Sequence, residues 1–295
     1  MPEKKPTKDQ HFVPKVYLQG FTNNSKTLYE YNLKTNIAID KPVSIESICK
    51  KQYLYEIRDN QGEIVNKNFI ENILCQYEGS FSEYRRKLLS KIVHKANFQS
   101  RCFLSKEEKN FWYFYTTLQL MRHPITLLGI KDIIKDELKG HFSDQEAYNF
   151  AVAYCLPIYK KPETGELNAL TFFLSILLTK VLTVGYAESD NLFTSDHAMC
   201  GSRKPGGDLL SFQRLWFPIS SNCALIFSDP TTVARDKRNR LIPISEEEVN
   251  INNNGIAYIA AQMILSKRPF SDADVALIRE ARSERELAES QKQEI

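Results

Sequence analysis

Apolar residues recur at helical spacing along the middle of the chain. From Asn66 onward they return every three or four positions, first through residues 69–77 and then through 84–93. This period places one apolar stripe along each segment, which is typical of helices that pack against a core. The sequence therefore predicts two amphipathic helices in this region.

A serine followed three residues later by a glutamate marks three further helix starts. The serine hydroxyl accepts a main-chain N–H of the first turn, and the glutamate reaches back to the N–H of the serine. We expect the last of these helices to run through Leu265. The pairs are Ser105 with Glu108, Ser143 with Glu146, and Ser245 with Glu248.

Extended segments are predicted at both ends of this helical region. Residues 28–39 alternate in polarity around a turn, which is typical of a hairpin, and residues 191–194 and 215–227 have the composition of strands. Ser44 is expected to cap a short helix through Gln52. The fold class is therefore α+β: mainly helical, with an N-terminal hairpin and a small sheet from the C-terminal half in one core.

The chain shows no internal repeat and no clear linker. Residues 1–9 are polar and lysine-rich, and we expect a disordered tail there. Residues 10–270 are interpreted as a single α+β domain. Residues 271–295 are expected to form a charged C-terminal helix whose end is solvated or frayed.

Composition excludes several classes of protein. The six cysteines contain no C-x-x-C pair, which argues against a zinc ribbon or a redox motif, and the net charge of +3 is too small to indicate nucleic-acid binding by itself. Residues 167–185 form the most apolar segment but hold too many polar residues for a membrane span, so we expect a buried helix there. No apolar signal segment opens the chain. We therefore expect a cytoplasmic protein with reduced thiols and no membrane partner.

His11 is the first candidate for chemistry because it directly precedes a helix that Pro14 is expected to start. The positive end of a helix disfavours an imidazolium, so the ring stays neutral and able to accept a proton or bind a metal. The alternative is a histidine that holds the entry turn through a hydrogen bond to the backbone.

Asp196 is the second candidate, because it follows the predicted strand at residues 191–194. A carboxylate at a strand end can bind a divalent cation or orient a histidine. The alternative is a turn in which Asp196 accepts backbone N–H groups. His197 is a weaker candidate because neighbouring residues on a strand face opposite sides.

Arg122 lies at the end of an aromatic-rich helix that we expect to be buried. A buried guanidinium needs a partner, either a carboxylate such as Asp196 or a bound phosphate, and Gln119 lies on the same helix face. The alternative is an arginine that simply favours a helix C-terminus. The loop that contains Arg203 and Lys204 can close over a phosphate, but it lacks the lysine and hydroxyl of a Walker loop.

Three short segments carry a family resemblance. QHFVPKVYLQGF, LQLMRHP and FTSDHAM resemble, in this order, the Q-H-x-x-P-x-x-Y-L-x-x-F, Q-x-x-R-x-P and T-S-D-x-P motifs of a mostly bacterial family, domain of unknown function 4238. WFPIS is similar to the F-P-L-S stretch that follows, and the resemblance spans about residues 9–265. Ala198 departs from the family's proline. The resemblance supplies no reaction, but it implies one constellation of Gln10, His11, Gln119, Arg122, Thr194, Ser195 and Asp196.

Two functions fit these residues. The first is a metal-assisted nuclease or phosphodiesterase, such as a toxin or phage-defence effector, in which Asp196 and His11 hold Mg²⁺ or Mn²⁺ and the ion activates water. His11 alternatively acts as the general base, and Arg122 stabilises phosphate charge. The substrate contacts are then expected from Gln10, Gln119, Thr194, Ser195, Arg203 and Lys204.

The second function is a sensor or adaptor without catalysis. In that interpretation the same polar side chains form a buried network, in which His11 and Asp196 pair with Arg122 to fix the N-terminal segment to the core. The protein would then bind a nucleotide, a nucleic acid or another protein through its surface.

Overall fold

The computed structural model describes residues 5–23, 26–93, 103–138, 141–156, 168–203 and 212–293, and its fold is α+β. The helices are α1 (Lys15–Leu18), η1 (Gln19–Phe21), α2 (Phe69–Val93), α3 (Lys106–Met121), α4 (Pro124–Glu137), α5 (Asp144–Cys155), α6 (Ala169–Leu178), η2 (Arg235–Lys237), α7 (Glu246–Ile259) and α8 (Asp272–Gln293). The strands are β1 (Asp9–His11), β2 (Thr27–Asn32), β3 (Ile37–Ala38), β4 (Val43–Ser44), β5 (Lys50–Gln52), β6 (Ile57–Arg58), β7 (Ile64–Val65), β8 (Val181–Tyr186), β9 (Thr194–Ser195), β10 (Cys200–Arg203), β11 (Phe212–Ser220), β12 (Cys223–Ser228), β13 (Leu241–Pro243) and β14 (Met263–Ser266).

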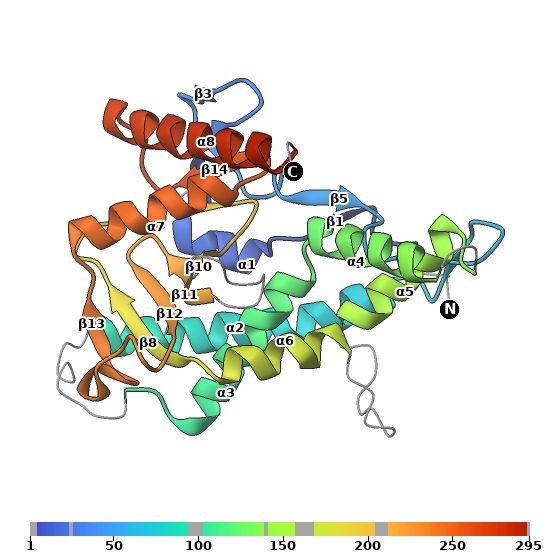
Figure 1. Ribbon diagram of the computed structural model, residues 1–295, viewed down its shortest axis with the longest axis horizontal. Coiled ribbons are helices and arrows are strands. Elements are labelled where there is room, and N and C mark those ends of the chain that lie inside the picture. Colours follow the sequence, from blue (N-terminus) through green and yellow to red (C-terminus); the bar gives the residue numbers. More distant parts are fainter. Residues whose placement is uncertain are drawn as a thin grey trace.

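A five-stranded sheet in the order β10-β11-β12-β8-β13 lies between two helical layers (Figure 1). Its strands pair antiparallel except β13, which runs parallel to β8. Side chains on β11 alternate between the faces, as the pleat requires. Leu215 and Phe217 join the larger apolar cluster with α2 and α3, whereas Trp216 joins a second cluster with α7.

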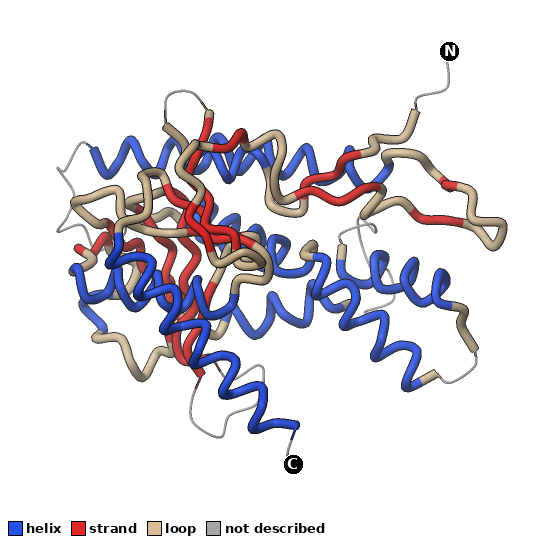
Figure 2. The backbone as a smooth tube through the Cα atoms, turned by 90° about the horizontal axis from the view of Figure 1, so that it is seen from above, coloured by secondary structure: helices blue, strands red, loops and turns tan. Residues whose placement is uncertain are grey.

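A second sheet joins the two ends of the sequence. Its order is β3-β2-β14-β9, so the N-terminal hairpin of β2 and β3 is paired to a strand from the C-terminal part of the chain. β9 pairs with the other edge of β14. β1 and β5 form a separate two-stranded ribbon, which Figure 2 shows running away from the five-stranded sheet.

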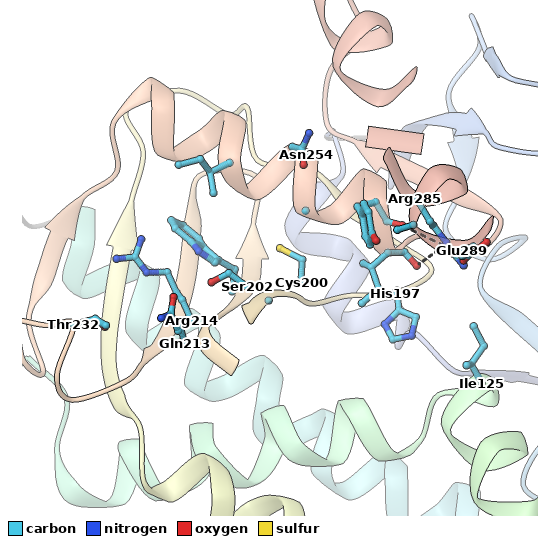
Figure 3. A pocket seen from close by; sticks show the side chains of 17 residues that line it. Ile125, His197, Cys200, Ser202, Gln213, Arg214, Thr232, Asn254, Arg285 and Glu289 are labelled. Atoms are coloured by element: carbon cyan, nitrogen blue, oxygen red, sulfur yellow. Dashed lines mark hydrogen bonds and ion pairs between the residues drawn. The ribbon is translucent and has the colours of Figure 1, made fainter. Parts of the chain in front are cut away.

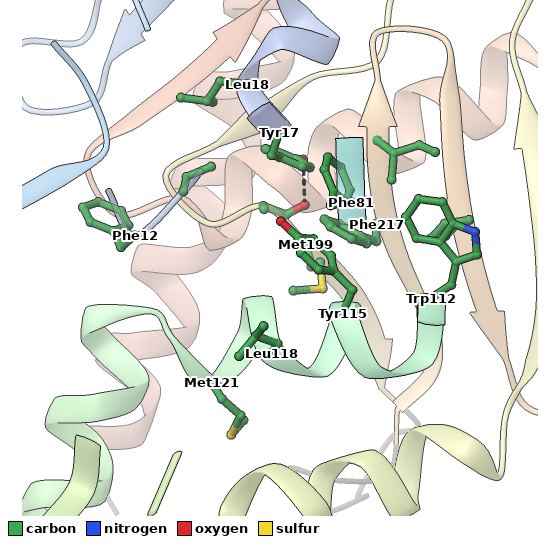
Figure 4. Close-up of a cluster of buried hydrophobic side chains, with 14 of the residues drawn as sticks. Phe12, Tyr17, Leu18, Phe81, Trp112, Tyr115, Leu118, Met121, Met199 and Phe217 are labelled. Carbon is green, nitrogen blue, oxygen red and sulfur yellow. Dashed lines mark hydrogen bonds between the residues drawn. The ribbon is translucent and has the colours of Figure 1, made fainter. Parts of the chain in front are cut away.

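Tyr17 on α1 is the point where the N-terminal segment meets the five-stranded sheet (Figure 4). Its ring stacks on Phe217 with the centroids 5.4 Å apart. Its hydroxyl lies 2.8 Å from Oγ1 of Thr194 and donates to the carbonyl of Pro218 at 2.7 Å. Gly20 follows, and a Cβ there would lie 2.4 Å from the Ile219 carbonyl. Only glycine therefore allows the chain to approach β11 this closely.

Several sequence predictions are confirmed. All three serine–glutamate capping boxes form, at the starts of α3, α5 and α7. The hairpin around residues 34–36 forms between β2 and β3. The two helices expected between residues 69 and 93 are one continuous helix, α2. In the part of the chain that the structure describes, no helix is both long and apolar enough to cross a membrane.

The helix predicted over residues 167–185 is wrong in its second half. α6 ends at Leu178, and residues 181–186 form β8 in the five-stranded sheet. The apolar pattern runs through both elements, and pairing of β8 with β12 and β13 overrides it. Gly185 lets a neighbouring side chain pack closely against β8, because a Cβ at this position would lie 2.6 Å from the side chain of Ile244.

Three smaller predictions are also wrong. Residues 43–44 and 50–52 are strands, not a helix capped by Ser44. α7 ends at Ile259, and the chain continues as β14 instead of a helix through Leu265. Asp9, expected in a disordered tail, pairs with Gln52 in the β1–β5 ribbon.

We predict that Tyr17→Phe lowers the free energy of unfolding by roughly 1–3 kcal/mol, because it leaves the buried Thr194 hydroxyl and Pro218 carbonyl without this partner. Chemical denaturation measures the loss. Tyr29→Phe is the matched control, because the Tyr29 hydroxyl makes no hydrogen bond within the described residues. Equal stability of the two variants would contradict this role for Tyr17.

Candidate functional site

Gln10 fixes the first motif to the segment that follows β5. Its amide nitrogen donates to Oε1 of Glu56 at 2.9 Å, and its amide oxygen accepts the N–H of Tyr55 at 2.7 Å. Glu56 also accepts the N–H of Asn68. Gln10 and Glu56 are both buried. The polar groups of Gln10 are therefore used within the protein, and they are not presented to a substrate.

Arg122, at the C-terminus of α3, is a buried charge of the motifs, with 1% of its surface exposed. Its guanidinium donates to the His11 carbonyl at 2.7 Å, to Glu78 at 2.8 Å and to the Tyr55 hydroxyl at 3.2 Å. Burial alone would lower the pKa of Arg122, but Tyr55 and Glu78 outweigh it and raise the pKa. The carboxylate partner that the sequence required is therefore Glu78 on α2, not Asp196.

His11 meets Arg122 through its main-chain carbonyl and not through its ring. Burial lowers the pKa of His11, and Lys15 lowers it further, so the ring is neutral at pH 7. Its Nε2 atom is buried and makes no hydrogen bond within the described part of the chain. The lowered pKa favours the neutral imidazole, and the ring is not among the partners of the Arg122 guanidinium.

Asp196 follows β9 and is 1% exposed. Its Oδ1 accepts the N–H of Ala261 at 3.1 Å and its Oδ2 accepts the N–H of Gln262 at 2.8 Å. Burial raises the pKa of Asp196, against the hydrogen bonds that these N–H groups donate. Both donors lie in the turn between α7 and β14. Asp196 thus holds a turn, which is the alternative that the sequence left open.

The three motifs come together largely through main-chain atoms. Gln119 donates to the Phe12 carbonyl at 2.9 Å, and Tyr17 bonds to Thr194. His123, next to Arg122, contacts the Asp196 carbonyl through Nε2 at 3.0 Å. The Ser195 hydroxyl bonds to the main chain of His197. Among the described residues, no hydrogen bond or ion pair joins the side chains of His11, Arg122 and Asp196.

The structure describes the residues expected to bind a metal, but only part of the loop expected to bind a phosphate. His11 and Asp196 stay predicted metal ligands, and no group of three or more His, Cys, Asp or Glu in the described chain has the geometry to hold an ion. Arg203 lies in β10, but its side chain is outside the described residues, as is Lys204. The closure of the 201–208 loop over a phosphate therefore stays a prediction.

A cavity of about 800 Å³ lies next to this network, between the β10–β11 ladder and α7 (Figure 3). Cys200 is opposite Trp216 and Ser202 is opposite Arg214 in the ladder, so all four side chains share the face of the sheet toward α7. α7 contributes a face that includes Tyr258, three residues before Ala261 in the turn held by Asp196. The volume is in the range of small-molecule sites.

Polar groups in this cavity have unused hydrogen-bonding capacity. The side chains of Gln213 and Asn254 and both ring nitrogens of His197 make no hydrogen bond to any described residue. Burial and the nearby Arg285 lower the pKa of His197 to about 4, so its ring is neutral and can both donate and accept. Within the described residues, Arg214 makes one ion pair, and it is long: Nη1 lies 3.9 Å from Oε1 of Glu248.

Sequence reasoning missed these cavity residues. His197 is the weaker candidate in the sequence because it neighbours Asp196 on a predicted strand. In the structure both residues lie in a bend after β9, where His197 lines the cavity and Asp196 bonds to the α7–β14 turn. Arg214 lies outside the motifs, and Trp216 opens the WFPIS segment without being a candidate for binding there. Only the strand register brings these two residues opposite Ser202 and Cys200. Glu78 and Tyr55, the partners of Arg122, also lie outside the motifs.

We predict that Arg122→Met lowers the free energy of unfolding by roughly 3–5 kcal/mol, because it removes one member of a buried ion pair and leaves the His11 carbonyl without its donor. Urea denaturation measures this loss. Lys87→Met removes an exposed ion pair with Glu83 and should leave the stability unchanged. An Arg122→Met variant as stable as Lys87→Met would show that the network does not support the fold.

We predict that the protein loses stability as the pH falls from about 6.5 to 4. The pKa values of His123 and His197 are lowered to about 3 and about 4, below the unfolded value of about 6.5. The unfolded chain therefore binds protons before the folded chain does, and acid favours unfolding in this window. His197→Gln should reduce the slope of melting temperature against pH, whereas His141→Gln, at an exposed position, should not. Equal slopes for both variants would contradict the assignment.

Comparison with known proteins identifies the motifs as those of a family. The model of a family described as protein of unknown function (DUF4238) matches residues 9–269, a range that contains every motif of the network. Comparison with curated proteins and with solved structures gave no match. Because the matched range covers most of the chain, this protein belongs to the DUF4238 family.

Proposed function

We propose that this protein is a binding module of the sensor or adaptor type, and that its ligand site is the cavity between the β10–β11 ladder and α7. One observation carries the proposal. The side chains of Gln10, Arg122 and Asp196 direct their polar groups to internal partners. His197 and Arg214 instead line an open cavity, and their polar groups have unused hydrogen-bonding capacity there. Convergent polar groups in a largely preformed cavity are what a small-molecule site requires.

The lining of the cavity favours a planar, anionic ligand, and a nucleotide has both properties. Trp216 and Tyr258 supply aromatic surface for a ring. Arg214 and Arg285 lie at opposite ends of the cavity (Figure 3), so each end has a cation. The neutral ring of His197 adds a donor and an acceptor that can bind a base or a sugar hydroxyl.

In this proposal the family motifs hold the wall of the cavity in place. Asp196 binds the N–H groups of Ala261 and Gln262, directly after the end of α7. His123 contacts the Asp196 carbonyl. α7 presents Tyr258 to the cavity, so the position of that ring depends on the turn that Asp196 holds. Motif residues then affect binding without touching the ligand.

A metal-assisted nuclease or phosphodiesterase is the second proposal, and the buried, unpartnered Nε2 of His11 is the observation in its favour. Asp196 supports it less, because each of its oxygens already accepts a main-chain N–H in a buried position. A toxin or phage-defence role and a cytoplasmic location belong to the same set of proposals.

We predict that AMP raises the melting temperature of the protein, because a ligand that binds only the folded state stabilises it. Tyr258→Leu should weaken AMP binding about 5- to 100-fold, through the loss of ring stacking, measured by calorimetric titration. Tyr29→Leu, a tyrosine outside the cavity, should bind AMP like the wild type.

Two results would contradict the binding module. One is that neither AMP, GMP, CMP nor UMP binds the wild type at millimolar concentration. The other is that Mg²⁺ or Mn²⁺ raises the melting temperature of the wild type but not of Asp196→Ala, with hydrolysis of a phosphodiester by the wild type. The second result would favour the hydrolase.

A further inference from the structure

One wall of the cavity comes from outside the family match. The match ends at residue 269, and α8 begins at Asp272. α8 nevertheless contributes Arg285, Ala288 and Glu289 to the cavity lining. The helix is firmly docked, because Ile278 and Ala281 on its inner face are fully buried. A segment beyond the family-matched range therefore helps to define what the cavity can hold.

Arg285 is fixed against the C-terminal end of α7. Its Nη1 atom lies 3.2 Å from the carbonyl oxygen of Tyr258 and 3.0 Å from that of Ala260. Arg282, one turn earlier on α8, also donates to the Ala260 carbonyl, at 2.8 Å. These carbonyls are the negative end of the helix, so both cations are well placed. The guanidinium of Arg285 is thus held in one orientation before any ligand arrives.

The remaining edges of Arg285 face the cavity. Its Nε atom donates to Oε1 of Glu289 at 2.7 Å, and its Nη2 atom makes no hydrogen bond within the described residues. The charge of Arg285 also contributes to the lowered pKa of His197, which places the two residues near each other. Glu289 is mostly exposed, with 57% of its side-chain surface accessible. An ion pair this exposed contributes little free energy, so another anion can replace Glu289 on Arg285.

We propose that Arg285 is the anion-binding residue of the cavity and that Glu289 is a built-in competitor for it. The ligand group is a phosphate monoester, whose oxygens take the Nε and Nη2 edge of Arg285 in the bidentate geometry that guanidinium favours. Its charge of nearly two exceeds that of the Glu289 carboxylate, so it displaces this side chain. This inference rests on the proposed function of the cavity as a nucleotide site.

Arg285 suits this role better than Arg214. The Arg214 guanidinium lies over the Trp216 ring at 5.9 Å and is not held by carbonyl groups. Its partner Glu248 belongs to the capping box of α7. A phosphate at the Arg285 end leaves the ring of the ligand beside Tyr258, whereas Arg214 lies at the far end of the cavity (Figure 3).

The test compares Glu289→Gln with Glu284→Gln, which removes the same charge from an exposed position on α8 outside the cavity lining. We expect Glu289→Gln to bind AMP about ten-fold more tightly than the wild type in calorimetric titration, which corresponds to about 1.4 kcal/mol. Glu284→Gln should bind AMP like the wild type. Adenosine, which lacks the phosphate, should bind both variants and the wild type equally.

A second pair of variants tests Arg285 itself. Arg285→Gln should weaken AMP binding by at least ten-fold and leave adenosine binding unchanged. A chain that ends after Ser283 removes Arg285 and Glu289 but keeps Ile278, Ala281 and Arg282, and it should lose the same preference for AMP over adenosine. The melting temperature of each variant without ligand shows whether α8 remains docked.

The outcomes separate the two proposals. If AMP binds the wild type but Glu289→Gln does not bind it more tightly, or Arg285→Gln does not weaken it, the inference is overturned and the cavity remains a nucleotide site. If AMP and inorganic phosphate bind neither the wild type nor Glu289→Gln, both the inference and the proposed function fail. If adenosine and AMP bind equally to the wild type, the phosphate has no role and the inference fails alone.

Discussion

The hydrogen bonds of the buried Arg122 guanidinium are the interactions on which the rest of the structure depends. A charge placed this deep must satisfy its donors internally, and it does so on three separate segments: the carbonyl of His11, the carboxylate of Glu78 and the hydroxyl of Tyr55. The N-terminal segment, α2 and the chain after β5 are therefore joined at one point on α3. Neighbouring His123 extends this join to Asp196 and, through it, to the end of α7.

The family motifs thus correspond mainly to a buried structural network, which we call the frame, and not to an exposed surface. Gln10, Gln119 and Thr194 are buried, and each is bonded to a segment distant in sequence. Buried polar networks of this kind specify one arrangement of the chain, since any other arrangement leaves their groups unpaired. The cavity lies next to this network, and its lining side chains such as Arg214 are not part of it. The frame and the ligand site are separate sets of residues.

Local signals in the sequence predict the helix starts, but not the partners of Arg122, the five-stranded sheet or the cavity. Ser105 and Glu108 interact within one turn, so their spacing alone predicts the cap. β8 forms because β12 and β13 flank it in the sheet. Both partner strands come from segments distant from β8 in the sequence. The cavity depends on the register of Ser202 with Arg214 and on the docking of α8, which no local pattern encodes.

The hydroxyl of Tyr17 has a consequence for the order in which the chain can fold during synthesis. Its partner, the Pro218 carbonyl, is 201 residues further along the sequence. At about 5–20 residues per second, the ribosome takes roughly 10–40 seconds to supply that partner. Until then α1 has no strand β11 to cover, and Tyr17 lacks its stacking partner Phe217. Contacts this distant in sequence form late and slow the search for the native state. The segment around Tyr17 is therefore expected to reach its native packing only after β11 has been synthesised.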